Sequence, residues 1–101
     1  MQAFRLVNKV NYQDGSVVSK EIMKKEAGIV TLFAFDKGQG LSEHTSSFDA
    51  LVNILDGQAE ITISGKPSIV KEGEVIIMPA NKPHSVQAKE RFKMLLVLIK
   101  R

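Results

Sequence analysis

The chain has 101 residues, which is enough for one domain with a modest hydrophobic core and excludes a second domain within it. Hydrophobic residues make up 44% and charged residues 25%, the proportions of an ordinary globular protein, so a disordered or fibrous chain is excluded. The formal net charge is +3 and there is no cysteine, which rules out a disulfide framework, a thiolate metal centre and a cysteine nucleophile.

The basic residues occur in small groups, such as Lys24-Lys25 and Lys100-Arg101, without aromatic residues between them. Binding of nucleic acid needs clustered cations and stacking side chains, so we expect a solvated surface and no nucleic-acid partner. Residues 1–10 lack the apolar run of a secretory signal, and the longest apolar stretch, Met94 to Ile99, is too short to span a bilayer. We therefore expect a cytoplasmic protein with no membrane partner.

Turn-forming residues recur about every ten positions, and the segments between them are rich in Val, Ile, Phe and Thr. This pattern predicts a single all-β domain, either a sandwich or a barrel. The expected strands are Val17 to Met23, Ile29 to Phe35, Ala50 to Leu55, Ala59 to Ser64, Val75 to Met78, Ser85 to Ala88 and Phe92 to Ile99.

Two kinds of strand pattern are present. Residues 59–64 alternate between apolar and polar side chains, which predicts a strand with one wet face. The segments Met94 to Ile99 and Ile29 to Phe35 are apolar at both odd and even positions, so both of their faces should be covered. A barrel has only one interior, so the second face is expected to meet a partner subunit. We therefore predict a homodimer with Phe92 to Ile99 or the N-terminal strands at the seam.

The chain has only two histidines, and the spacing around each of them is distinctive. The first series is Gly38, five residues, His44, one residue, Ser46, three residues, Ala50, six residues and Gly57. In the second series five residues separate Gly73 from Pro79, and His84 comes five positions after Pro79.

With these two series, at about residues 38–57 and 73–88, the chain resembles the cupin family. The resemblance implies a jelly-roll β-barrel, also called a double-stranded β-helix, formed by residues 1–101 as one domain. It also implies a metal held by two histidines and a glutamate of the first motif and one histidine of the second. Here Ser46 stands in place of the second histidine and Ala50 in place of the glutamate. The resemblance therefore implies a degenerate metal site with His44 and His84 alone, open to Zn, Ni, Fe, Mn or Cu.

The proline-bounded segment 79–83 is expected to act as a rigid loop that aims His84 into the barrel. Residues two apart on a strand point to the same side, so the even-numbered residues from His44 to Ala50 are expected to face the lumen together. With apolar neighbours they define a predicted ligand pocket: His44, Ser46, Phe48, Ala50, Met78, His84 and Met94.

Three functions remain open from the sequence. The first is binding of a small polar ligand in the lumen through His44 and His84. The second is a metal-dependent enzyme, of the oxygenase or isomerase type, with a reduced two-histidine site. The third is a scaffold for dimerisation or interaction with an inert cavity. No residue is assigned a catalytic role.

Overall fold

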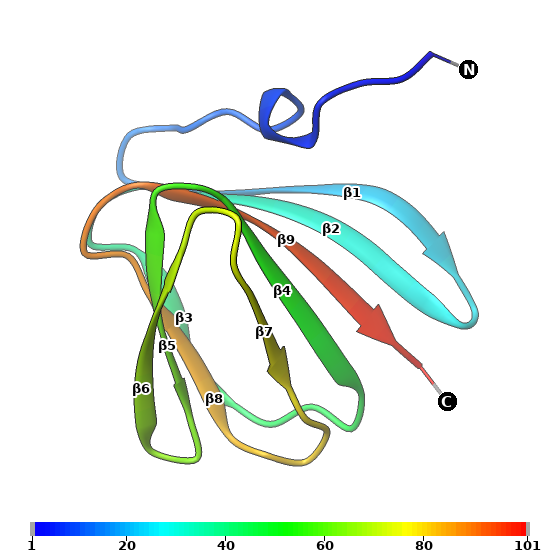
Figure 1. The fold of residues 1–101 in the computed structure, drawn as a ribbon, viewed down its shortest axis with the longest axis vertical. Coiled ribbons are helices and arrows are strands. Elements are labelled where there is room, and N and C mark those ends of the chain that lie inside the picture. The colour runs from blue at the N-terminus through cyan, green and yellow to red at the C-terminus, as the bar shows by residue number, and fades with distance from the viewer. Residues whose placement is uncertain (1, 101) are drawn as a thin grey trace.

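Two antiparallel sheets form the protein, as seen in the computed structural model, which describes residues 2–100 (Figure 1). The first sheet has the strand order β1-β2-β9-β4-β7 and the second has the order β3-β8-β5-β6. The elements are η1 (Leu6–Asn8), β1 (Val17–Lys25), β2 (Gly28–Phe35), β3 (Gly40–His44), β4 (Asp49–Asp56), β5 (Gln58–Ile63), β6 (Lys66–Lys71), β7 (Val75–Met78), β8 (His84–Gln87) and β9 (Phe92–Ile99). No helix among residues 2–100 is long and apolar enough to cross a membrane.

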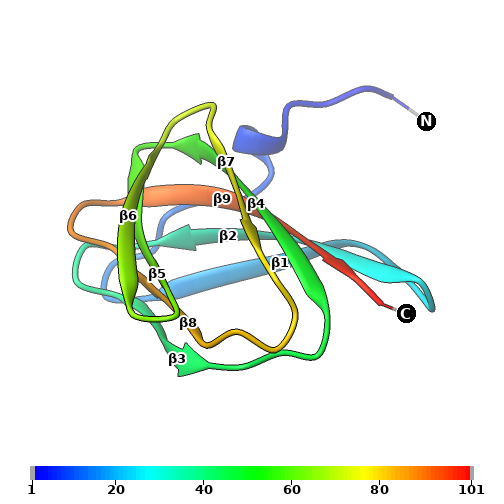
Figure 2. The same ribbon diagram turned by 60° about the horizontal axis from the view of Figure 1, so that its bottom comes forward.

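The sheets enclose a barrel, and the β1-β2 hairpin extends beyond it as an arm (Figures 1 and 2). The predicted all-β jelly-roll architecture is confirmed. Alternation decides which side chains enter the barrel: in β4, Ala50, Val52 and Ile54 are buried while their neighbours are partly exposed. The aromatic rings of Phe35 and Phe92 stack inside it, with centroids 4.5 Å apart and an interplanar angle of 13°.

Two strands were not expected from the sequence, and one expected strand is divided. Strand β3 contains no Val, Ile or Phe, and β6 is an edge strand that is mostly exposed and carries Pro67, so neither has an apolar signature. Strand β3 ends at His44 and β4 begins at Asp49. A loop therefore carries Ser46 and Phe48, so the premise of one strand from His44 to Ala50 is wrong, although all four side chains do line the same cavity.

The N-terminal segment covers part of the outer face of the five-stranded sheet. Val10 is buried against Leu32 and Ala34 of β2, which explains why β2 is apolar at both odd and even positions. Tyr12 Oη donates to Asp56 Oδ2 at 2.6 Å, and Lys93 Nζ donates to the carbonyl oxygen of Val7 at 2.7 Å. This chain thus covers the Leu32 and Ala34 part of the second face of β2 with its own residues.

An ion pair at the end of this segment gives a prediction about acid stability. Arg91 Nε and the backbone N–H of Gly15 each donate to the Asp36 carboxylate at 2.6 Å. These bonds, that from Arg91 most of all, lower the pKa of Asp36 from 3.8 to about 2. A carboxyl group with a lowered folded-state pKa stabilises the fold above its unfolded-state pKa, and that contribution disappears as the pH falls through the folded-state value.

Asp36→Asn is therefore expected to lower the free energy of unfolding at neutral pH, and its deficit relative to wild type should shrink as the pH falls from about 4 to about 2. Urea unfolding of both proteins across this range measures the difference. A deficit that does not change with pH would contradict this account of Asp36.

Candidate functional site

The two histidines lie side by side on adjacent strands at one end of the barrel. Strands β3 and β8 pair, and His44 and His84 are register partners at the end of that ladder. Their Nε2 atoms are 3.0 Å apart, and their ring centroids are 4.3 Å apart with the planes at 73°. His84 is buried, with 5% exposure, whereas His44 is exposed. The structure therefore brings the two predicted imidazoles together.

Two hydrogen bonds donated by backbone N–H groups join the segments that adjoin these two strands. The N–H of Asn81 donates to the carbonyl oxygen of Ser46 at 2.7 Å, and the N–H of Ala80 donates to Asp49 Oδ1 at 2.8 Å. Asn81 has a φ of 65°, a left-handed conformation that asparagine tolerates better than most residues. The loop before β8 is thereby attached to the loop between β3 and β4, close to both histidines.

Each ring also makes a contact through its other nitrogen, Nδ1, and this contact determines which nitrogen carries the hydrogen. His44 Nδ1 lies 2.8 Å from the carbonyl oxygen of Ser42, and His84 Nδ1 lies 3.1 Å from the carbonyl oxygen of Lys82. A carbonyl oxygen only accepts, so each Nδ1 must be the donor. In a neutral imidazole with hydrogen on Nδ1, the Nε2 atom has a lone pair. The two lone pairs therefore point at one another.

This arrangement needs a positive centre between the rings. Two facing lone pairs at 3.0 Å repel, and a hydrogen bond between them requires a second proton on one ring. A proton held between the rings would give the histidine pair, His44 and His84, one positive charge. The other residues that line the cavity are apolar apart from Ser46, so none of them would balance that charge.

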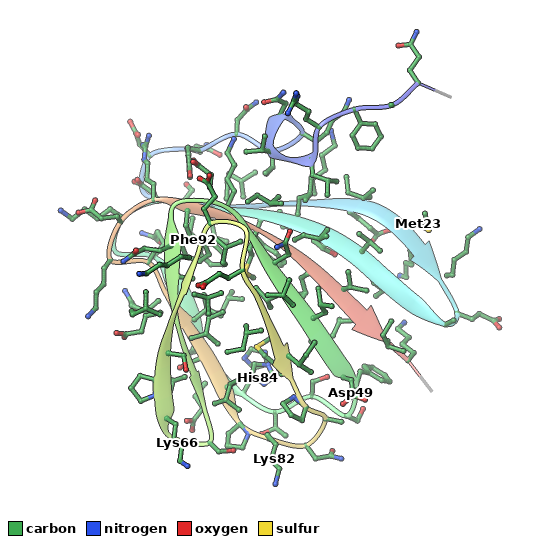
Figure 3. The ribbon with its side chains drawn as sticks, in the orientation of Figure 1. Met23, Asp49, Lys66, Lys82, His84 and Phe92 are labelled. Carbon is green, nitrogen blue, oxygen red and sulfur yellow. The ribbon has the colours of Figure 1, made fainter. Side chains whose placement is uncertain are left out.

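A cavity of about 320 Å³ extends from the histidine pair into the barrel. All seven residues that the sequence placed in the pocket line it. Four further lining residues were not predicted: Leu41, Val86, Leu96 and Leu98. Figure 3 shows His84 at the end of the barrel opposite Phe92, so the Phe35–Phe92 stack closes one end and the imidazoles lie at the other.

The side chains at this site do not fit a metal ion held by four protein ligands. Ala50 offers no donor atom, and Ser46 Oγ accepts a hydrogen bond from the N–H of Phe48 at 3.1 Å. Residues 2–100 contain no group of three or more His, Cys, Asp or Glu side chains placed to hold a metal. A stable protein site usually uses three or four such ligands, and only His44 and His84 are present here.

Fold and site together define a small jelly-roll barrel with a mainly apolar cavity and a pair of histidines at one end. A family model for the cupin domain, Cupin_2, matches residues 31–99. The chain belongs to the cupin family, whose members often bind metals. The predicted family and barrel fold are confirmed by this match.

Solved structures of other proteins agree closely with this fold. A conserved protein of unknown function from Streptococcus pyogenes is 39% identical with a TM-score of 0.94, over 99% of this chain and 88% of its own. A Cupin 2 conserved barrel domain protein from Leptotrichia buccalis is 46% identical with a TM-score of 0.93, over 96% of this chain and 47% of its own. A cupin superfamily protein from Desulfitobacterium hafniense is 28% identical with a TM-score of 0.94, over 99% of this chain and 92% of its own. Comparison with curated proteins finds no match.

Proposed function

We propose that this cupin binds a compact, largely apolar ligand with one anionic head group, and that the head lies on the His44–His84 pair. The observation that carries the proposal is the facing pair of Nε2 atoms, each on a ring whose Nδ1 is held by a backbone carbonyl. A carboxylate beside the protonated pair would balance its charge. For a direct bond, the Nε2–H that bridges the two rings would turn to the carboxylate, and a charge-assisted hydrogen bond of this kind is stronger than a bond between neutral groups.

The cavity supports the shape of the proposed ligand. Apolar side chains from β4, β7 and β9 form its wall, including Ala50, Met78 and Met94. Its volume of about 320 Å³ is at the lower end of ligand pockets in proteins, so the ligand should be small. The polar atoms are concentrated at one end, which favours a ligand with one charged end and an apolar body.

Matched pairs of probes test the proposal. Benzoate and hexanoate should raise the melting temperature of the wild-type protein, because a ligand that binds only the folded state stabilises it. Benzamide and hexanamide have similar shapes without the charge, and should bind about 10- to 100-fold more weakly by titration calorimetry. Equal affinity for the acid and its amide would overturn the anionic head group.

Two variants separate the head group from the cavity. His44→Gln replaces an exposed ring, so it should fold normally and lose most of the preference for the carboxylate over the amide. Ala50→Leu should fill the lumen and weaken both members of each pair. If neither variant changes any binding, the lumen is not the site, and the inert scaffold becomes the better account of the protein.

The metal-dependent enzyme is the competing function, and donor count disfavours it. Protein purified without chelators and then supplied with Fe, Mn, Ni, Cu or Zn should retain less than one equivalent of each metal. Binding of benzoate should also survive treatment with EDTA. One tightly held equivalent per chain, or binding lost with EDTA, would favour the metal-dependent site instead.

A further inference from the structure

The side of β9 that lines the lumen continues into a lysine. Met94, Leu96 and Leu98 line the cavity, so the even-numbered residues at this end of β9 face the lumen. Alternation places Lys100, which directly follows the strand, on the same side. Its N–H donates to the carbonyl oxygen of Ala27 at 2.8 Å, so the backbone from which this side chain projects is held in place.

The register of β4 and β9 brings Lys100 to the rim of the cavity. Ala50 pairs with Leu98, and both line the cavity. Continued by two positions, this register places Phe48 opposite Lys100. The two side chains meet there, with Lys100 Nζ 5.9 Å from the centroid of the Phe48 ring. Since Phe48 lines the cavity and is partly exposed, the ammonium group lies at the rim.

Residues 2–100 leave the charge of Lys100 available to a ligand. No carboxylate among them lies within 4 Å of its Nζ atom. The acid next to Phe48 is Asp49, which points away from the lumen because its neighbour Ala50 points into it. The Oδ1 atom of Asp49 accepts the hydrogen bond from the N–H of Ala80. A lysine ammonium group has three donors and no acceptor, so the complement of this position is an anion.

We infer that the ligand of this barrel carries a second anionic group, and that Lys100 binds this group at the rim while the histidine pair binds the first. The inference rests on the proposed function, because it concerns the other end of the same ligand. The lumen still holds one head group and an apolar body, since the second group projects beyond the cavity wall. A short, straight-chain dicarboxylate has this form, and each of its ends would meet a cation in a charge-assisted hydrogen bond.

A second carboxylate favours binding only if a cation receives it. A carboxylate that leaves water for an apolar rim without a partner loses its hydration, which weakens binding. The Phe48 side chain has no hydrogen-bond donor, so Lys100 is the group that compensates this loss. The flexible four-carbon stem of lysine also lets the ammonium group follow dicarboxylates of slightly different length. The affinity for a dicarboxylate, relative to a monocarboxylate with the same number of carbons, therefore measures the role of Lys100.

Titration calorimetry with matched acids tests the second anionic group. The pairs are glutarate with pentanoate, adipate with hexanoate, and pimelate with heptanoate. At least one dicarboxylate should bind the wild-type protein about three- to tenfold more tightly than its monocarboxylate partner. If hexanoate binds but no dicarboxylate binds more tightly than its partner, this inference is overturned and the proposed function stands. If none of the six acids binds, both are overturned.

Three variants, each checked for folding by its melting curve, assign the preference to Lys100. Lys100→Gln should bind hexanoate as the wild type does and lose at least about threefold in affinity for the preferred dicarboxylate, whereas Lys100→Arg should keep the preference. Lys20→Gln is the matched control, because Lys20 is exposed on β1, does not line the cavity, and its replacement lowers the net charge equally. Equal losses for Lys100→Gln and Lys20→Gln would overturn the inference, since net charge alone would then favour the dianion. Equal losses of hexanoate and dicarboxylate binding in Lys100→Gln would also overturn it, because Lys100 would then only cover the Phe48 ring.

Discussion

Phe92→Ala is expected to lower the free energy of unfolding by about 3–5 kcal/mol, a large share of the total stability of a domain of this size. The Phe92 ring has 0% exposure and stacks on Phe35, which is equally buried. Truncation removes the apolar burial and leaves a cavity that neighbouring strands cannot fill, because their backbones are fixed in both sheets. Urea unfolding at low temperature measures the loss.

The control is Phe4→Ala, because the Phe4 ring is 53% exposed. Its free energy of unfolding should stay within about 0.5 kcal/mol of the wild-type value. Phe92 does not line the ligand cavity, which opens at the other end of β9. Phe92→Ala should therefore still be stabilised by benzoate while it remains folded. A loss below about 1 kcal/mol would mean that the Phe35–Phe92 stack does not hold this end of the barrel together.

Strands with a clear apolar signature were predictable from the sequence, and strands without one were not. Val75 to Met78 matches β7 and Phe92 to Ile99 matches β9, because runs of Val, Ile, Leu and Met favour strands. Strand β3, with the sequence Gly-Leu-Ser-Glu-His, is held mainly by pairing with β8. Such pairing is tertiary information, and local composition does not contain it.

Prediction of the candidate site from the sequence was limited in the same way as prediction of the strands. The resemblance to the cupin motifs, and not spacing alone, predicted that His44 and His84 share the lumen, but it does not show that both Nδ1 atoms meet backbone carbonyls. Leu96 and Leu98 were missed as lining residues, although alternation places them on the same side of β9 as Met94, which was predicted to line the pocket. Because β9 is apolar at every position from 94 to 99, the pattern of side chains did not single them out.

Gly57 joins the two sheets, and its replacement gives the second large expected effect. It is the one residue between β4, in the five-stranded sheet, and β5, in the four-stranded sheet. Its φ is 74°, and a Cβ there would overlap the carbonyl oxygen of Arg91. Alanine must therefore adopt a left-handed conformation and also displace the backbone that leads into β9.

Gly65→Ala separates these two costs, because Gly65 has a φ of 80° but nothing lies within 4 Å of a Cβ built there. That variant should lose about 1–2 kcal/mol from the left-handed conformation alone. Gly57→Ala should lose a further 1–3 kcal/mol or so from the overlap, giving a clearly lower urea midpoint than Gly65→Ala. Since this overlap also shifts β9, whose far end lines the cavity, Gly57→Ala should weaken benzoate binding while Gly65→Ala leaves it unchanged. Equal midpoints for the two variants would mean that the crossing between the sheets can relax at little cost.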